Sequence, residues 1–332
     1  RESLVGDRSQ EAGDRRRAPL PRRCRVRELS LIIPVYKNEA SLPDLLTALR
    51  GLHAELQCRL DVVLVVDGSP DRCHDLLREA LPAQPFEATL VLLSRNFGSF
   101  AAVRAGLAQA DGRYFAVMAA DLQEPPGLVV EMFDALETTE VDVVVGVRAA
   151  RQDPALQRWQ AQLFWAAYRR WVVPQMPAGG VDVFACNRVF RDALLALEES
   201  RSSLIAQIFW LGFRRAEVSY VRQERQHGSS AWSWQKKISY MADSVFAFTD
   251  LPIRALLLTG SVGVLVATAL GALALAGKVL DLIAVPGYAM TMLAILFFGA
   301  LNLLSLGIVG SYAWRAYENT KGRPQALVLK VD

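Results

Sequence analysis

The sequence predicts an α/β protein in which a doubly wound, mostly parallel sheet is followed by two membrane-spanning helices. Apolar runs of strand length alternate with segments of helical spacing in the first half of the chain, as in parallel sheets covered by helices. Two long uncharged stretches lie nearer the end. With 332 residues, the chain has room for a sizeable soluble domain and a membrane portion.

Three strand-and-helix units come first. The apolar run LSLIIPV precedes a helix with leucines at helical spacing, and Leu60–Val66 forms the second strand. In the third unit, a strand at Leu90–Leu93 leads to a helix at Ser99–Ala110. A further strand is expected at 142–148. The sequence has neither GxGxxG after the first strand nor GxxxxGK[ST], which disfavours a dinucleotide-binding domain and an NTPase-type phosphate loop.

The stretch Tyr114–Gly127, YFAVMAADLQEPPG, is the strongest candidate for a functional site. It reads as a buried strand whose carboxyl end delivers Asp121 and Gln123, and ligands of such sheets gather at that edge. A carboxylate and an amide oxygen suit a hard cation, Mg²⁺ or Mn²⁺, that carries a diphosphate. A plainer interpretation makes Asp121 the cap of a helix beginning at Pro125 or Pro126. The residues alone leave both open.

Two segments are long enough to cross a membrane. Ala255–Gly277 is 23 residues without a charge and Leu282–Trp314 is 33, whereas roughly 20 suffice. The connection carries Lys278 and Asp281, while the outer ends are flanked by Arg254, Arg315, Lys321 and Arg323. By the positive-inside rule we expect a multi-pass protein of the inner (plasma) membrane with both ends and the soluble domain in the cytoplasm. The Arg-rich N-terminus lacks the apolar core of a signal peptide.

The charge of the chain is concentrated at its start. The net charge is +3, and the first 30 residues hold nine Arg against five acids, so the remainder is −1. No folded basic face is predicted, and we expect no nucleic-acid partner. Residues 1–28 read as a disordered basic arm, either simply solvated or attracted to anionic lipid. The four cysteines have no CxxC spacing and read as reduced residues.

Past Arg148 the pattern favours helices, first around Trp159–Trp171 and then after Asp182. Two glycines precede Asp182 in GGVDVFACNR, which fits either a functional carboxylate or a turn with a capping Asp.

The segment Ser219–Lys237 combines Arg222, Arg225 and two tryptophans just before the membrane. Arginine binds phosphate through forked donors, and tryptophan favours headgroup depth. The following apolar stretch is expected to form an interfacial helix that ends at Pro252.

The motifs along the chain are, in order, PVYKNE, VVDGSPD, SRNFGS, DLQEPP, GVRAARQDP, GGVDVFACNR and YVRQERQHGSS, and the two spans follow them. This order of motifs resembles that of the family 2, GT-A fold polyprenyl-phosphate glycosyltransferases. Bactoprenol glucosyltransferases and dolichyl-phosphate mannose synthases are members. The likeness runs from Leu29 to Pro324. It implies a cytoplasmic GT-A domain at 29–220, a juxtamembrane amphipathic segment at 221–254, two spans within 255–314 and a cytoplasmic tail at 315–332.

The resemblance implies inverting transfer of one sugar from a nucleotide sugar, expected to be UDP-linked, to polyprenyl (undecaprenyl) phosphate at the cytoplasmic membrane face. Asp121 and Gln123 would hold the Mg²⁺ or Mn²⁺ and the diphosphate, and Asp182 would lie by the acceptor as a second catalytic residue. The other implied substrate-binding residues are Pro34, Tyr36, Glu39 and Asp67 for base and ribose, Arg222 and Arg225 for phosphate, and Arg95, Arg148 and Ser229.

The chain departs from the family pattern at several places. Ala119 stands where an acid is usual two residues before Asp121, and Gly68 where a second acid often follows Asp67. Ser99 and Ala231 stand where lysine is common. These departures predict that the protein binds the metal ion and the phosphate groups more weakly.

Two rival functions account for parts of the sequence. A processive polysaccharide synthase would carry QxxRW, but the residue three before Arg158 is Ala155. A catalytically silent membrane scaffold that binds nucleotide sugar or a flippase would explain Ala119 and Gly68. A homo-oligomer is also possible, since small residues in the spans permit close helix contacts: Gly260, Gly263, Gly299, Gly307 and Gly310.

Overall fold

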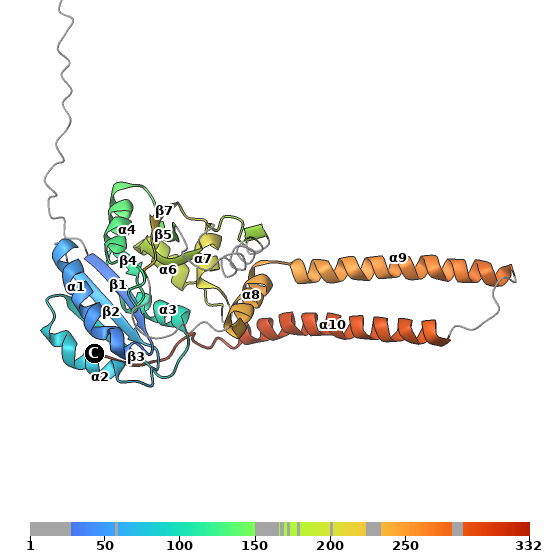
Figure 1. Ribbon diagram of the computed structural model, residues 1–332, viewed down its shortest axis with the longest axis horizontal. Helices are drawn as coiled ribbons and strands as arrows, with labels where there is room; N and C mark the ends of the chain where they lie inside the picture. The colour runs from blue at the N-terminus through green and yellow to red at the C-terminus, as the bar shows by residue number, and fades with distance from the viewer. Residues whose placement is uncertain are drawn as a thin grey trace, which may run out of the picture.

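The computed structural model describes residues 28–56, 59–149, 166, 169–170, 173–177, 180–199, 202–223, 234–280 and 288–332. An α/β domain forms one end of the molecule, and two long helices extend from it side by side (Figure 1). The strands are β1 (Glu28–Val35), β2 (Arg59–Val66), β3 (Glu87–Leu93), β4 (Tyr114–Val117), β5 (Val143–Arg148), β6 (Val181–Asn187), β7 (Arg215–Tyr220) and β8 (Val328–Val331). The helices are α1 (Leu42–Leu56), α2 (Cys73–Ala80), α3 (Ser99–Gln109), α4 (Gly127–Thr138), α6 (Arg188–Leu195), α7 (Leu204–Trp210), α8 (Trp234–Phe248), α9 (Leu251–Val279) and α10 (Tyr288–Thr320).

The eight strands form one mixed sheet in the order β7-β5-β6-β4-β1-β2-β3-β8. β1 runs parallel to β2 and β4, β2 to β3, and β5 to β7. β6 is antiparallel to both β4 and β5, and β8 is antiparallel to β3. The predicted mostly parallel α/β sheet is therefore confirmed, with β1 to β5 within a few residues of their expected positions.

The expectation of helices after Arg148 is wrong for one segment, because residues 181–187 form strand β6. This strand lies between β4 and β5, so Phe184 and Cys186 are almost completely buried. The continuous apolar run of this segment is what a strand buried on both faces requires. The expected helix around Trp159–Trp171 falls mostly outside the described residues.

Two hydrophobic cores cover the two faces of the sheet. One packs α1, α2 and α4 against the strands, and its helix residues include Leu45, Leu77 and Met132. The other packs α3, α6 and α7, with Met241 and Val245 of α8 against its rim. The apolar side of α8 is thus partly covered by the soluble domain.

Pro252 does not end the juxtamembrane helix as the sequence suggested. Helix α8 already ends at Phe248, and Pro252 is the second residue of α9. Proline is tolerated in the first turn of a helix, where its missing N–H leaves no hydrogen bond unmade.

Helices α9 and α10 contain the two segments suited to crossing a membrane, Leu251–Leu273 and Phe297–Thr320, with mean hydropathies of 2.1 and 1.4. Their apolar side chains face outward: Leu265 is 70% exposed and Leu303 is 72% exposed. Buried core helices of a soluble protein would not show this exposure, so these segments are apolar enough and exposed enough for a membrane.

The tail beyond α10 returns to the sheet, which the sequence did not predict. β8 pairs with β3, and Leu90 and Asp332 exchange two backbone hydrogen bonds of 2.9 Å. Ser94 also donates its backbone N–H to the carbonyl oxygen of Leu327 at 2.9 Å. The end of α10 therefore lies on the same side of the helix pair as the α/β domain (Figure 1).

Two of the four cysteines, Cys73 and Cys186, are buried free thiols, as predicted. Burial raises the pKa of Cys73 to about 12 and also raises that of Cys186, so both remain protonated at neutral pH. Cys24 and Cys58 lie outside the described residues.

Candidate active site

The loop between β4 and α4 carries Asp121 and Gln123, as the sequence predicts. Helix α4 begins only at Gly127, with Pro126 as its N-cap and no side-chain cap hydrogen bond. Asp121 instead accepts the backbone N–H of Gln123 at 3.4 Å. The interpretation of Asp121 as a helix cap is therefore wrong.

The turn between these two side chains is strained. Leu122 has φ of 54°, a left-handed conformation that a branched L-residue rarely adopts. Across the described residues, the other non-glycine residue with positive φ is Lys37, beside Tyr36. Such backbone strain concentrates at functional sites, and here both cases adjoin predicted site residues.

Arg222 reaches this loop from the segment after β7. Its guanidinium donates to Oε1 of Gln123 at 2.5 Å, and Gln223 donates its backbone N–H to the carbonyl oxygen of Gln123 at 2.8 Å. The loop predicted to hold the diphosphate and the arginine predicted to bind phosphate are thus in contact, although about 100 residues separate them in the chain.

Asp182 lies inside β6, which excludes the alternative of a turn with a capping Asp. Arg148, at the end of β5, forms a forked ion pair with both carboxylate oxygens of Asp182. Tyr220, at the end of β7, donates its hydroxyl to the same carboxylate at 2.8 Å. Burial lowers the pKa of Arg148, but the Asp182 carboxylate outweighs it and the net pKa is raised.

Glu124 is buried beside these groups, although no local pattern singled it out. Its side chain is 3% exposed, and its Oε2 has no hydrogen-bond partner in the described structure. Burial, together with the carboxylates of Asp182 and Asp121, raises its pKa to about 7, although Arg222 opposes the shift. The Nε of Arg222 is likewise buried and has no hydrogen-bond partner among the described residues.

Asp67 holds a neighbouring loop. It is 2% exposed, and its two oxygens accept the backbone N–H groups of Phe97 and Gly98 at 2.7 and 2.8 Å. Gly68 has φ of +54°, and an added Cβ would lie 2.2 Å from the backbone carbon of Arg95. An acid at position 68 therefore cannot fit without moving this loop.

The remaining predicted residues lie nearby. Pro34 is in β1, and the turn that follows places Tyr36 and Glu39. A carboxylate oxygen of Glu39 accepts the backbone N–H of Arg72 at 3.1 Å, which joins this turn to the one after β2. The exposed guanidinium of Arg95 lies 4.0 Å from the ring centre of Phe97. Arg225 and Ser229, like Ala231, fall outside the described residues.

Comparison with known proteins identifies the family. Residues 30–196 match the profile of glycosyl transferase family 2. An undecaprenyl-phosphate 4-deoxy-4-formamido-L-arabinose transferase of Pseudomonas aeruginosa is 36% identical over 91% of this chain and 90% of its own. This chain belongs to glycosyl transferase family 2.

Two further similarities accompany this family 2 glycosyltransferase. An uncharacterized glycosyltransferase of Synechocystis is 32% identical over 91% of this chain and 94% of its own. A solved glucosyl-3-phosphoglycerate synthase from Mycobacterium tuberculosis, in complex with Mn²⁺, UDP and glucosyl-3-phosphoglycerate, aligns with a TM-score of 0.44 at 17% identity, covering 66% of this chain and 80% of that one.

The oxygen donors available to a cation in this glycosyltransferase are few. No three His, Cys, Asp or Glu side chains of the described residues come together as a metal-binding group. Ala119 contributes none, and Oε1 of Gln123 already accepts from Arg222. Asp121 with Gln123 fits a hard cation only as part of its ligand set, so the remaining ligands have to come from a substrate or water.

Tyr220 and Glu124 are the residues that sequence reasoning missed. Glu124 is inside the quoted DLQEPP motif, and Tyr220 is the first residue of YVRQERQHGSS. Their relevance appears only when β6 and β7 bring Asp182 and Arg222 to the β4–α4 loop.

Proposed function

We propose that this glycosyltransferase transfers a single sugar from a UDP-linked donor to undecaprenyl phosphate, with inversion, at the cytoplasmic face of the membrane. The observation that carries the proposal is the extent of the similarity. Undecaprenyl-phosphate sugar transferases match 91–94% of this chain at 33–36% identity, so the match extends beyond the α/β domain to the segments able to cross a membrane.

The residues present suit a phosphate nucleophile. A phosphate monoester has a second pKa near 6 and is mostly dianionic at pH 7, so the acceptor needs no strong base. Its oxygen would form a bond to the anomeric carbon as the bond from that carbon to the donor diphosphate breaks, and attack from the opposite side inverts the centre. The protein then has to position two anions and balance their charge.

Asp182 fits a positioning role in this reaction better than a role as a base. Both of its oxygens are engaged by Arg148, and one of them also by Tyr220. We assign this cluster to the orientation of the acceptor phosphate or of a sugar hydroxyl. Arg222 would bind phosphate while keeping its contact with Gln123, and Arg225 and Ser229 would extend the same surface.

On the donor side, Pro34, Tyr36, Glu39 and Asp67 are proposed to bind the nucleoside, with Arg95 nearby. Asp67 would act partly through the loop that its two hydrogen bonds hold. Asp121 and Gln123 would share Mg²⁺ or Mn²⁺ with the donor diphosphate. When bound, the cation would neutralise charge on the leaving diphosphate.

The return of the chain to the sheet supports the proposed topology. β8 follows α10 and pairs with β3, so the chain has to cross the membrane an even number of times between the domain and β8. Two crossings satisfy this. The basic flanks of the two helices then favour a cytoplasmic domain in a multi-pass protein of the inner membrane.

The test is transfer by purified protein in detergent with undecaprenyl phosphate, Mn²⁺ and a panel of radiolabelled nucleotide sugars. We expect one UDP-sugar to give label extractable into chloroform. The matched control is Arg214→Gln, which alters an arginine tied to Asp142 and Glu140 away from the site and should retain activity. Binding of nucleotide sugar without any lipid-linked product would favour the scaffold instead, and long water-soluble products would favour a processive synthase.

A further inference from the structure

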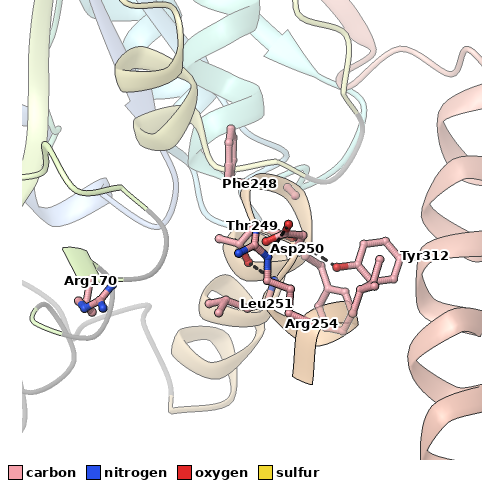
Figure 2. Close-up of a pocket in the computed structure, with 10 residues that line it drawn as sticks. Arg170, Phe248, Thr249, Asp250, Leu251, Arg254 and Tyr312 are labelled. Atoms are coloured by element: carbon pink, nitrogen blue, oxygen red, sulfur yellow. Dashed lines mark hydrogen bonds and ion pairs between the residues drawn. The ribbon is translucent and has the colours of Figure 1, made fainter. Parts of the chain in front are cut away.

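A cavity lies where α8 ends, α9 begins and α10 approaches its end, at a place to which no role has been assigned. Its volume is about 610 Å³. The chain segment from Phe246 to Leu251 forms one wall, and α9 and α10 contribute Arg254 and Tyr312. Arg170 lies across from this group (Figure 2).

The polar part of this cavity presents opposite charges side by side. The Nε of Arg254 donates to the carboxylate of Asp250 at 2.8 Å, and these side chains are 74% and 61% exposed. The Tyr312 hydroxyl points toward the same turn and donates to the carbonyl oxygen of Thr249 at 3.4 Å (Figure 2). A guanidinium has five N–H donors, so Arg254 keeps donors for a ligand while it holds Asp250.

A second cavity of about 350 Å³ continues from the first between α9 and α10. The two share Ile253 and Tyr312 as lining residues. The second is almost entirely apolar, with Leu256, Leu257 and Val309 in its walls. A charged mouth that leads into an apolar groove matches a molecule with an ionic head and a hydrocarbon chain.

We propose that these two cavities form a binding site for a zwitterionic phospholipid with an ethanolamine head. Its phosphate would lie on Arg254, its ammonium on Asp250, and an acyl chain between α9 and α10. The adjacent opposite charges favour this head over an anionic head without an ammonium, because only the ammonium would pair with Asp250. The proposal rests on the membrane attachment proposed above.

The site would stabilise the joint between the α/β domain and the membrane helices. Next to it, Arg315 of α10 pairs with Asp243 of α8 at 2.6 Å, and Phe246 lies edge-to-face with Tyr312 at 5.2 Å. A lipid in the cavity would bridge these two helices and α9. It would act apart from the reacting groups, because among the described residues none that is assigned to donor or acceptor lines either cavity.

Native mass spectrometry of the full chain, released from neutral detergent micelles, tests the site directly. Micelles would contain phosphatidylethanolamine or phosphatidylglycerol, which differ in the ammonium group. We expect the wild type to retain the ethanolamine lipid roughly fivefold more, as one charge contact of about 1 kcal/mol would give. Asp250→Asn should abolish this preference, Asp250→Glu should restore it, and Arg254→Gln should weaken retention of both lipids.

The matched control is Arg323→Gln, an exposed arginine beyond α10, which should keep the wild-type preference. Equal retention of the two lipids by the wild type, or an unchanged preference in Asp250→Asn, would overturn the proposal. Displacement of the phospholipid by undecaprenyl phosphate would also overturn it and make the cavity part of the acceptor path. Lipid retention is measured without turnover, so a failed transfer assay would contradict the proposed function alone.

Discussion

Different kinds of contact stabilise the two ends of the central sheet. At the β5–β7 end, the guanidinium of Arg148 from β5 and the hydroxyl of Tyr220 from β7 meet the Asp182 carboxylate of β6. At the β3–β8 end, the contacts are backbone hydrogen bonds, and all four residues of β8 are exposed. The first end should therefore be sensitive to single side-chain changes, and the second mainly to whether a strand is present at all.

The largest effect is expected at Asp121, which lies beside the β5–β7 end of the sheet. Asp121→Asn should lower kcat/KM by roughly 1,000-fold, about 4 kcal/mol, because an amide holds a cation poorly next to a diphosphate. Ala119→Asp should act in the opposite direction and lower the Mn²⁺ concentration needed for half-maximal rate. Titrating the rate against Mn²⁺ for the three proteins measures both. Full activity of Asp121→Asn, or of the wild type in excess chelator, would rule out the proposed metal site.

Arg148→Gln should have the next largest effect, on stability as well as rate. Removing Arg148 leaves the Asp182 carboxylate without its ion pair; the two side chains are 12% and 27% exposed, and breaking a partly buried pair of this kind costs up to about 3 kcal/mol. Chemical denaturation monitored by tryptophan fluorescence would measure the loss. The control Arg214→Gln breaks a more exposed pair, with Arg214 61% exposed, and should cost less than about 1 kcal/mol. If Arg148→Gln and Arg214→Gln lowered the free energy of unfolding equally, the Arg148–Asp182 pair would have no special role in this end of the sheet.

Glu124→Gln tests the same end of the sheet through the pH dependence of stability. The pKa of Glu124 is raised to about 7 from an ordinary 4.5, so the folded state holds this proton more tightly than the unfolded state. Its contribution to stability is complete below pH 4.5 and is lost as pH rises through 7. Relative to Glu124→Gln, the wild type should lose up to roughly 3 kcal/mol between pH 5 and pH 8. Denaturation at several pH values in chelator and without donor tests this, and parallel pH profiles would show that Glu124 ionises normally.

The sequence predicts those elements and site residues whose position in the fold follows from the local sequence pattern. β1 to β4 are apolar runs that end at turns, and the polar residues after them have to meet at one edge of a parallel sheet. For this reason Asp121 and Gln123 could be located from the sequence. For Asp182 the residues alone left a functional carboxylate and a capping residue open, and only the resemblance favoured the first; the structure then added its partners Arg148 and Tyr220.

The contacts that were missed depend on pairing between distant segments. No local signal indicates that Arg222 will bond to Gln123, or that Glu124 will be buried among other carboxylates. β8 is harder still, because LVLKVD is short and β8 has no buried face, so the segment is held mainly by the edge of β3. A segment of this kind reads as a tail until the edge that it meets is known.

The smallest expected effect is at the backbone end, on deletion of residues 326–332. This removes the hydrogen bonds of β8 with β3 and the bond from Ser94 to Leu327. Because β8 buries little, we expect a loss of only about 1 kcal/mol in the free energy of unfolding. Ser94 begins the loop that Asp67 holds through Phe97 and Gly98, so the KM for the donor should also rise by roughly threefold, with kcat and the KM for the lipid nearly unchanged. Leu329→Ala is the matched control, because Leu329 is 67% exposed and the change keeps the backbone; it should behave as the wild type. If Leu329→Ala weakened the protein as much as the deletion, side-chain packing would hold β8, and the distinction between the two ends of the sheet would fail.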